Sequence, residues 1–289
     1  MKKKCSDLND VSKAALIRAA REAVAGALAG DFPIDPLIGK ELSRALSCIG
    51  SVVKRHGSLI EMGIACALVA TDRFIVLPKV ALPLTKAALQ LVDSKNSDES
   101  LAKIRLSADS EADGMVNLDL CVVDPEAGWA GVYEIKRGNG ATEHGKRRPI
   151  MRKLRAVRPV LASYVHQLGY GQIETVTSAV IDYFGSSGFD PHFTITRDKL
   201  DEHFGVPVVA TVDAMTAAVR DALEAELPTL FEPVFDRMTS SNDDMPALPN
   251  PGTATVGKFV PTNVTMLRGL TAAPVGPGKR RSESHKVRH

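Results

Sequence analysis

The sequence predicts a mixed α/β fold: a central β-sheet flanked by helices, with a helical region before the sheet and a flexible tail after it. Three observations support this. The first 71 residues carry helical apolar spacing. Between residues 74 and 184, runs rich in Val, Ile and Leu alternate with helical patterns, the order expected of a sheet covered by helices. From residue 237 the chain holds six prolines, five glycines and no sustained apolar period, which is typical of a disordered segment.

These changes divide the chain into three parts. We expect a helical N-terminal region over residues 1–56, an α/β core over 57–236 and a flexible, basic-ended tail over 237–289. The 289 residues suit one globular domain of about 200–250 residues with additional segments.

Three helices are expected before the sheet. They cover residues 11–30, 37–55 and 58–71. The DFPIDP stretch ends the first helix, because its prolines remove backbone donors and fix φ. Gly57 closes the second. Ser58 and Glu61 lie three residues apart, so they predict a capping box at the start of the third.

The sheet is expected to begin with residues 74–84, an apolar run rich in β-branched residues. Pro78 and Pro83 cannot donate to a strand ladder, so they favour an edge strand, a bulge or a turn. The later runs 115–123 and 129–135 flank the turn-forming DPEAG, and together they predict a β-hairpin.

Residues 93–114, before the hairpin, are polar and predict a loop or a loosely ordered insertion. After the hairpin, Pro149 is suited to the start of a helix. Apolar residues then recur at steps of three and four, which gives this helix one apolar face with basic residues off it. The apolar positions are Ile150, Leu154, Val157, Leu161, Val165 and Leu168, and the basic ones are Arg152, Lys153, Arg155 and Arg158.

Beyond this helix, β-branched residues predict strands over 175–184 and 206–212. A final helix is expected over 214–235, with Pro228 as an interruption. The resulting order of helices, strand, hairpin, helix, two strands and helix supports a mixed sheet.

Charge is unevenly distributed along the chain. The net charge is only +2, but residues 136–158 hold nine Lys or Arg against one acid, Glu143. Such a stripe is an electrostatic footprint for phosphate, and its alternative interpretation is an ordinary solvated face. The residues predicted to hold DNA phosphates are Lys146, Arg147, Arg148, Arg152, Lys153 and Arg155.

The predicted hairpin carries a candidate catalytic group. Glu134 and Lys136 are two apart on a strand and project to the same side. Asp119 lies fifteen residues earlier, on the preceding strand, where a short hairpin brings it close to Glu134. Two converging carboxylates suit a hard cation such as Mg²⁺. A lysine beside them can stabilise a phosphorane-like transition state or lower the pKa of a metal-bound water.

This arrangement resembles the PD-(D/E)XK nuclease superfamily, over roughly residues 50–185. The resemblance implies a mixed sheet in the order α-β-β-β-α-β. It implies that Asp119 and Glu134 are Mg²⁺ ligands and that Lys136 is their charged catalytic partner. The nominal Pro-Asp of the family is Leu118-Asp119 here, a departure at a position that varies widely.

Many members of that superfamily also carry a Gly-x-x-x-Glu segment on the helix before the sheet. Gly57 and Glu61 have this spacing, so the resemblance implies that Glu61 is a further catalytic and metal-binding residue. Its alternative role is the helix cap described above.

Other acids compete for these roles. Asp109 and Asp113 precede Asp119, and Asp124 lies at the turn. The tripeptide Asp93-Ser94-Lys95 also has the acid-x-Lys form, but it follows a helical pattern and lacks the strand context. The alternative for Glu134 and Lys136 is a surface ion pair on an edge strand, and for Asp119 a solvated acid near the turn.

The leading functional hypothesis is a Mg²⁺-dependent endodeoxyribonuclease of restriction type. Residues 1–56 and 185–235 would then read DNA sequence or form a homodimer. A resolvase or repair nuclease of the same superfamily is the second hypothesis. The third is a non-catalytic DNA-binding or protein-binding module on that fold, and the fourth is an unrelated α/β protein whose acids never converge.

Other classes are disfavoured by the pattern. The four cysteines are far apart and form no CxxC pair, so a structural zinc site is not expected. No secretory signal or membrane-length apolar run is visible, so we expect a soluble, cytoplasmic protein.

Overall fold

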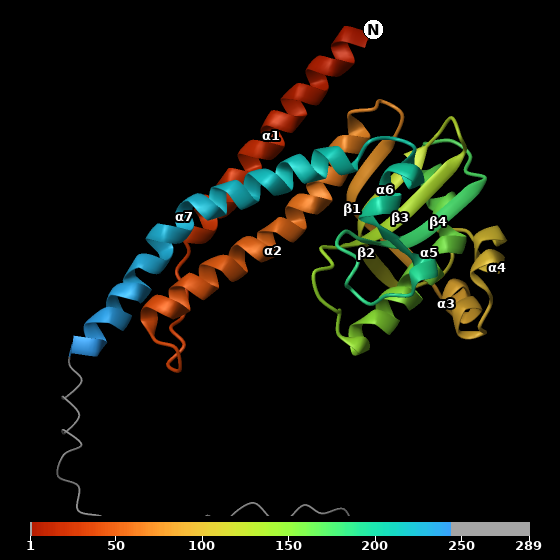
Figure 1. Ribbon diagram of the computed structural model, residues 1–289. Coiled ribbons are helices and arrows are strands. Elements are labelled where there is room, and N and C mark those ends of the chain that lie inside the picture. Colours follow the sequence, from red (N-terminus) through yellow and green to blue (C-terminus); the bar gives the residue numbers. More distant parts are fainter. Residues whose placement is uncertain (1, 244–289) are drawn as a thin grey trace, which may run out of the picture. The chain divides into compact units, whose positions relative to one another are not determined.

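The computed structural model describes residues 2–243, and within this range the strands form one mixed five-stranded sheet (Figure 1). Its spatial order follows the sequence: β1 (Ile75–Thr85), β2 (Ala112–Asp124), β3 (Trp129–Lys136), β4 (Thr175–Asp182) and β5 (Thr194–Thr196). The β1–β2 and β2–β3 pairs are antiparallel, whereas β3–β4 and β4–β5 are parallel. The prediction of a mixed sheet with helices is confirmed, as is the hairpin.

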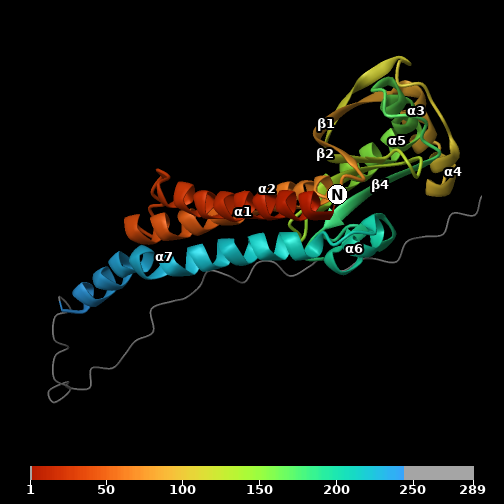
Figure 2. The same ribbon diagram turned by 90° about the horizontal axis from the view of Figure 1, so that it is seen from above.

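Helices precede, connect and follow these strands. They are α1 (Lys2–Leu28), α2 (Lys40–Val69), α3 (Lys86–Asp93), α4 (Asp98–Lys103), α5 (His144–Gln167), α6 (Arg197–Phe204) and α7 (Val209–Asp243), with a short 3₁₀ helix at Pro191–Phe193. The long helices α1, α2 and α7 pack against one another, as both ribbon views show (Figures 1 and 2).

Each face of the sheet buries its own apolar core. On one face, Ile60 and Ile64 of α2 pack with Leu120 of β2. On the other face, Leu154 and Leu161 of α5 pack in a second core that also includes Cys121 and Val123 of β2. Helices α2 and α5, which carry the predicted Glu61 and the predicted basic stripe, therefore cover opposite faces.

Helix α2 corrects the prediction of two helices separated at Gly57. It runs unbroken through that residue, so Ser58 is not an N-cap and Glu61 has no capping role. Both halves of α2 bury an apolar stripe, with Cys48 and Val52 before Gly57 and Ile60 after it. This packing offsets the cost of about 1 kcal/mol for a glycine inside a helix. The predicted boundary at residue 56 therefore falls within one helix.

The segment over residues 93–114, predicted as a loop or a loosely ordered insertion, contains regular secondary structure. It contains α4 and the first residues of β2. Ser97 caps α4 by accepting a hydrogen bond from the Ser100 amide, and Leu101 is fully buried. A single buried leucine gives no period that a sequence pattern can detect.

Helix α5 begins at His144, earlier than the expected start at Pro149, and contains both Pro149 and Pro159. The apolar run Val206–Val212 is not the strand that was predicted, because α7 begins at Val209. Val212, Met215 and Val219 are buried at helical spacing, and this tertiary packing overrides the strand preference of the local β-branched residues.

The C-terminal half also differs at two further places. Pro228 does not interrupt α7, which continues to Asp243, so residues 237–243 of the expected tail are helical. The rest of that tail, residues 244–289, lies outside the described residues. Among the helices of residues 2–243, none is long and apolar enough to cross a membrane.

Candidate active site

Asp119 lies where β2 separates from β3. The two strands pair from Asp124 and Trp129 as far as Leu120 and Tyr133. At the next residue, Asp119 Oδ2 accepts a hydrogen bond from the Ile135 amide at 2.7 Å. The carboxylate therefore takes the place of a backbone acceptor, which fixes it beside the end of β3 that carries Glu134 and Lys136.

In both β1 and β2, the regular alternation of side chains between the two faces of the sheet is interrupted. The two interruptions lie at the same level of the sheet. In β2, Leu118 and Cys121 both belong to the core on the α5 side, although they are three residues apart. In β1, Leu77 and Val80 show the same spacing, and Lys79 between them has a φ of 52°. This local irregularity directs Lys79 and Asp119 toward α2.

Glu61, Lys79 and Asp119 form what we call the carboxylate–lysine cluster. Lys79 Nζ lies 3.0 Å from Asp119 Oδ1 and also forms an ion pair with Glu61. Burial raises the pKa of the Glu61 carboxyl above its ordinary value, and the charge of Asp119 adds to this effect. Helix α2, β1 and β2 thus bring two acids to one shared cation.

Glu134 and Lys136 form a second pair beside this cluster. Lys136 Nζ lies 2.5 Å from Glu134 Oε1, and both side chains are partly buried. The positive charge of Lys136 acts on Glu61 and opposes the rise in its pKa, so the pair lies within electrostatic reach of the cluster. All four sequence-predicted residues therefore gather in one region, together with Lys79, which was not predicted.

The fit to a divalent cation is partial. Among residues 2–243, no group of three or more His, Cys, Asp or Glu side chains is arranged to hold a metal ion, so Glu134 does not join Glu61 and Asp119 in one ligand set. Mg²⁺, however, is usually held by one or two carboxylates together with waters and substrate phosphates. Glu61 and Asp119, whose carboxylates already share the ammonium group of Lys79, meet that requirement.

The competing acids have other partners. Asp124 is buried, binds Arg73 at 2.7 Å and accepts a hydrogen bond from the Ala127 amide. Asp109 accepts a hydrogen bond from Gln167. Asp113 is exposed, and its charge acts on Arg152 of α5. None of these three acids contacts the carboxylate–lysine cluster.

The loop after Lys136 is anchored on two sides. Gly138 has a φ of 73°, and a Cβ there would overlap the buried carboxylate of Asp182. Arg137 Nε donates to His56 Nδ1 at 3.0 Å. Burial lowers the pKa of His56 to about 4, so its ring is neutral near pH 7 and can accept this bond. These contacts hold the end of β3 in place.

The six predicted phosphate-binding residues of α5 are largely engaged within the protein. Lys146 pairs with Glu143, Arg152 with Asp93 and Arg155 with Asp98, while Arg147 donates to the Gly188 carbonyl. Arg148 and Lys153 are exposed, and neither forms an ion pair within residues 2–243.

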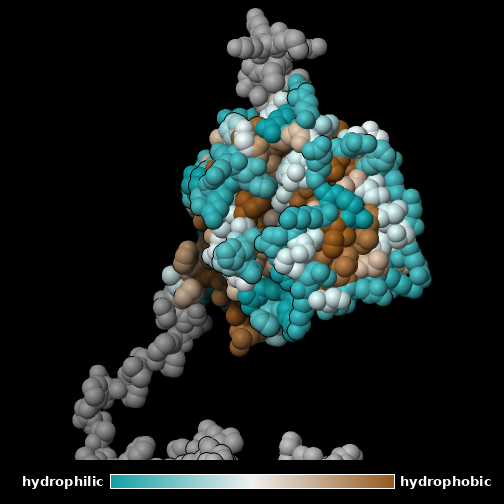
Figure 3. Space-filling model, turned by 90° about the vertical axis from the view of Figure 1, so that its right-hand side faces the viewer, coloured by the Kyte–Doolittle hydropathy of each residue, from teal (hydrophilic) through white to brown (hydrophobic). Residues whose placement is uncertain are grey.

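A groove of about 1030 Å³ lies along this part of α5. Arg147, Arg148, Arg152, Lys153 and Arg155 line it together with apolar side chains such as Phe189. On the side of the molecule where α3 and α4 lie, hydrophobic patches are interspersed with hydrophilic side chains (Figure 3). The basic stripe therefore borders a groove of mixed character.

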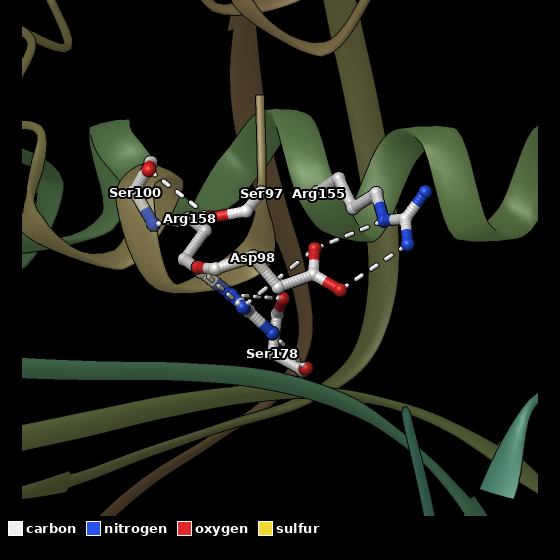
Figure 4. Close-up of polar contacts among 6 residues, drawn as sticks. All are labelled: Ser97, Asp98, Ser100, Arg155, Arg158 and Ser178. Atoms are coloured by element: carbon white, nitrogen blue, oxygen red, sulfur yellow. Dashed lines mark hydrogen bonds and ion pairs between the residues drawn. The ribbon is translucent and has the colours of Figure 1, made fainter. Parts of the chain in front are cut away.

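Arg158 is not part of an exposed stripe, contrary to its predicted position off the apolar face. Its side chain is buried against the sheet, where it donates to Ser178 Oγ at 3.1 Å and to the Ser178 carbonyl at 2.9 Å. It also donates to the Asp98 carbonyl at 3.1 Å, while Arg155 binds the Asp98 carboxylate (Figure 4). We call these residues the Arg158 network.

The chain was compared with protein-family models, with curated proteins and with solved structures, and none of them matches it. The function is therefore inferred from the geometry of the site.

Proposed function

We propose that this protein is a Mg²⁺-dependent endodeoxyribonuclease of the PD-(D/E)XK type. The observation that carries the proposal is that Glu61 and Asp119 converge on the ammonium group of one lysine. They do so beside the strand that carries Glu134 and Lys136. Two acids that converge on one point, where a Mg²⁺ ion would bind, together with a lysine beside them would meet the needs of phosphodiester hydrolysis.

The order of elements supports the same proposal. From α2 onward, the helix and the strands that carry the site follow the order α2, β1, β2, β3, α5 and β4, with two short helices between β1 and β2. Apart from that insertion, it is the α-β-β-β-α-β order that the resemblance implies. The acids also come from the elements that the resemblance assigns to them: Glu61 from the helix before the sheet, and Asp119 and Glu134 from the hairpin.

Each residue then has a chemical role. Glu61 and Asp119 would hold the Mg²⁺ ion, which supplies Lewis acidity and an activated water at the scissile phosphate. Lys136 places a positive charge where negative charge develops on the phosphate oxygens, and Glu134 orients that ammonium group. Arg148 and Lys153, which lack acidic partners among residues 2–243, contact the DNA backbone.

We place restriction-type cleavage first because α1, α2 and α7 provide long surfaces outside the sheet that can read DNA sequence or bind a second copy of the chain. A resolvase or a repair nuclease would use the same site on a different substrate. Plasmid, four-way junction and flap DNA therefore distinguish these roles.

The decisive experiment is cleavage of supercoiled plasmid in Mg²⁺ or Mn²⁺, with EDTA as the metal-free reference. We expect Asp119→Asn to lower the rate by about 10³-fold and Lys136→Met by about 10²-fold, the range seen when a group that stabilises a transition state is removed. Asp113→Asn is the matched control, since Asp113 is an exposed acid of the same strand. It should cut like the wild type.

Two results would contradict the proposal. One is intact DNA with every metal tested, and the other is equal cleavage by Lys136→Met and wild type. Salt-sensitive DNA binding without cleavage would instead identify a non-catalytic DNA-binding module.

A further inference from the structure

Lys79 has an unusual backbone for its place in the fold. It lies within β1 and has a φ of 52°, in the left-handed region that residues other than glycine seldom occupy. Its neighbours Pro78 and Val80 pair with Leu120 and Leu118, the residues on either side of Asp119. Strained residues of this kind cluster at functional sites, where the surrounding structure holds them.

The irregular backbone directs Lys79 to one point. Its ammonium group contacts the carboxylates of Glu61 and Asp119, which come from a helix and a strand that are otherwise separate in sequence. Both acids face this one ammonium group and carry the same charge when ionised, so they repel each other without a cation between them.

We propose that Lys79 is the built-in counter-ion of the metal site. In the metal-free protein its ammonium group occupies the place between Glu61 and Asp119, and an incoming divalent cation displaces it from the same oxygens. Lys79 is thus a positioning residue that keeps the two ligands together before the metal binds. The inference rests on the metal-binding part of the proposed function.

The side chain is suited to such an exchange. It is 64% exposed, so the ammonium group can withdraw into water when it is displaced. A lysine carries its charge on a flexible four-carbon stem, whereas a divalent cation brings twice that charge to the same oxygens. Lys136 differs, because it is less exposed and pairs with Glu134 instead.

The test is the affinity of the full chain for Mn²⁺, measured by titration calorimetry and by the electron paramagnetic resonance of free Mn²⁺. Lys79→Met keeps an unbranched side chain, which is no worse suited to the left-handed backbone, and removes the charge. We expect it to bind Mn²⁺ about three- to tenfold more tightly than wild type, because no ammonium group competes. Lys79→Arg should restore the weaker wild-type affinity.

A second measurement follows the metal-free state. In EDTA, Lys79→Met should lower the melting temperature, and adding Glu61→Gln should reverse that loss, because the repulsion between the acids is gone. Lys95→Met is the control, as Lys95 is an exposed lysine outside the site that also has a left-handed backbone, with a φ of 59°. It should change neither the Mn²⁺ affinity nor the melting temperature.

The outcomes separate this inference from the nuclease proposal. Unchanged or weaker Mn²⁺ binding by Lys79→Met overturns the counter-ion role, even if the wild type cuts DNA. Tighter Mn²⁺ binding by a chain that cuts no DNA supports the counter-ion role and overturns the nuclease. A chain that binds no Mn²⁺ in either form overturns both.

Discussion

Two charged clusters lie on opposite faces of the same sheet. They differ in whether the cation at their centre is buried in the protein or exposed to solvent. In the Arg158 network, a buried guanidinium donates to fixed oxygens of Ser178 and Asp98. In the carboxylate–lysine cluster, an exposed lysine with a left-handed backbone bridges two acids. The closed network is suited to stability, because its hydrogen-bonding groups are satisfied inside the protein. The open cluster can exchange its cation for another and is suited to chemistry.

The largest expected effect on stability comes from removing the buried guanidinium of the Arg158 network. Arg158→Met should lower the free energy of unfolding by about 3 kcal/mol, since it leaves buried acceptors without a donor. Arg155→Met, on the same helix, removes a more exposed ion pair with the same Asp98 and should cost about 0.5 kcal/mol. Urea denaturation of both variants measures the difference. Equal losses would mean that the buried network adds nothing beyond a surface pair.

A smaller loss of stability is expected at the buried contact that anchors the loop after Lys136. Gly138→Ala forces a Cβ into the carboxylate of Asp182 at a positive φ, and should cost about 2 kcal/mol of folding stability. Gly140→Ala is the matched control, because a Cβ there meets no atom within 4 Å. If both variants unfold at the same denaturant concentration, the anchor after Lys136 is not rigid.

The parts of the fold that depend on local pattern could be predicted from the sequence. The hairpin of β2 and β3 follows from two apolar runs around a turn, and β1 and β4 follow from their β-branched residues. The run Val206–Val212 has the same local composition, yet most of it is helical in α7, because packing against α2 decides the outcome there.

The site could be predicted only in part. Asp119, Glu134 and Lys136 lie on a hairpin, so their proximity follows from sequence spacing. The place of Lys79 depends on one residue's φ and on the pairing of β1 with β2, neither of which a sequence pattern shows. The only feature of the sequence that could have pointed to Lys79 was its position as a single lysine after a proline in an apolar run.

The predicted position of Arg158 was wrong because charge was given more weight than helical spacing. Arg158 lies four residues after Leu154 and three before Leu161, which places it on the apolar face of α5. Its charge led to the opposite prediction. Spacing was the better guide, because a buried arginine is acceptable when its donors are satisfied, as they are at Ser178 and Asp98.

The smallest expected effect concerns the exposed basic residues near the open groove of α5. Replacing Arg148 and Lys153 with Gln should weaken DNA binding about three- to tenfold and reduce the slope of log affinity against log salt by up to about 2, one unit for each lost phosphate contact. The same changes at Lys95 and Lys103, exposed residues of the α3–α4 segment that do not line the groove, are the control. Fluorescence anisotropy across a salt series measures both pairs. Equal weakening by the two pairs would show that binding follows net charge rather than the face of α5, and the sequence-predicted phosphate footprint would then be wrong.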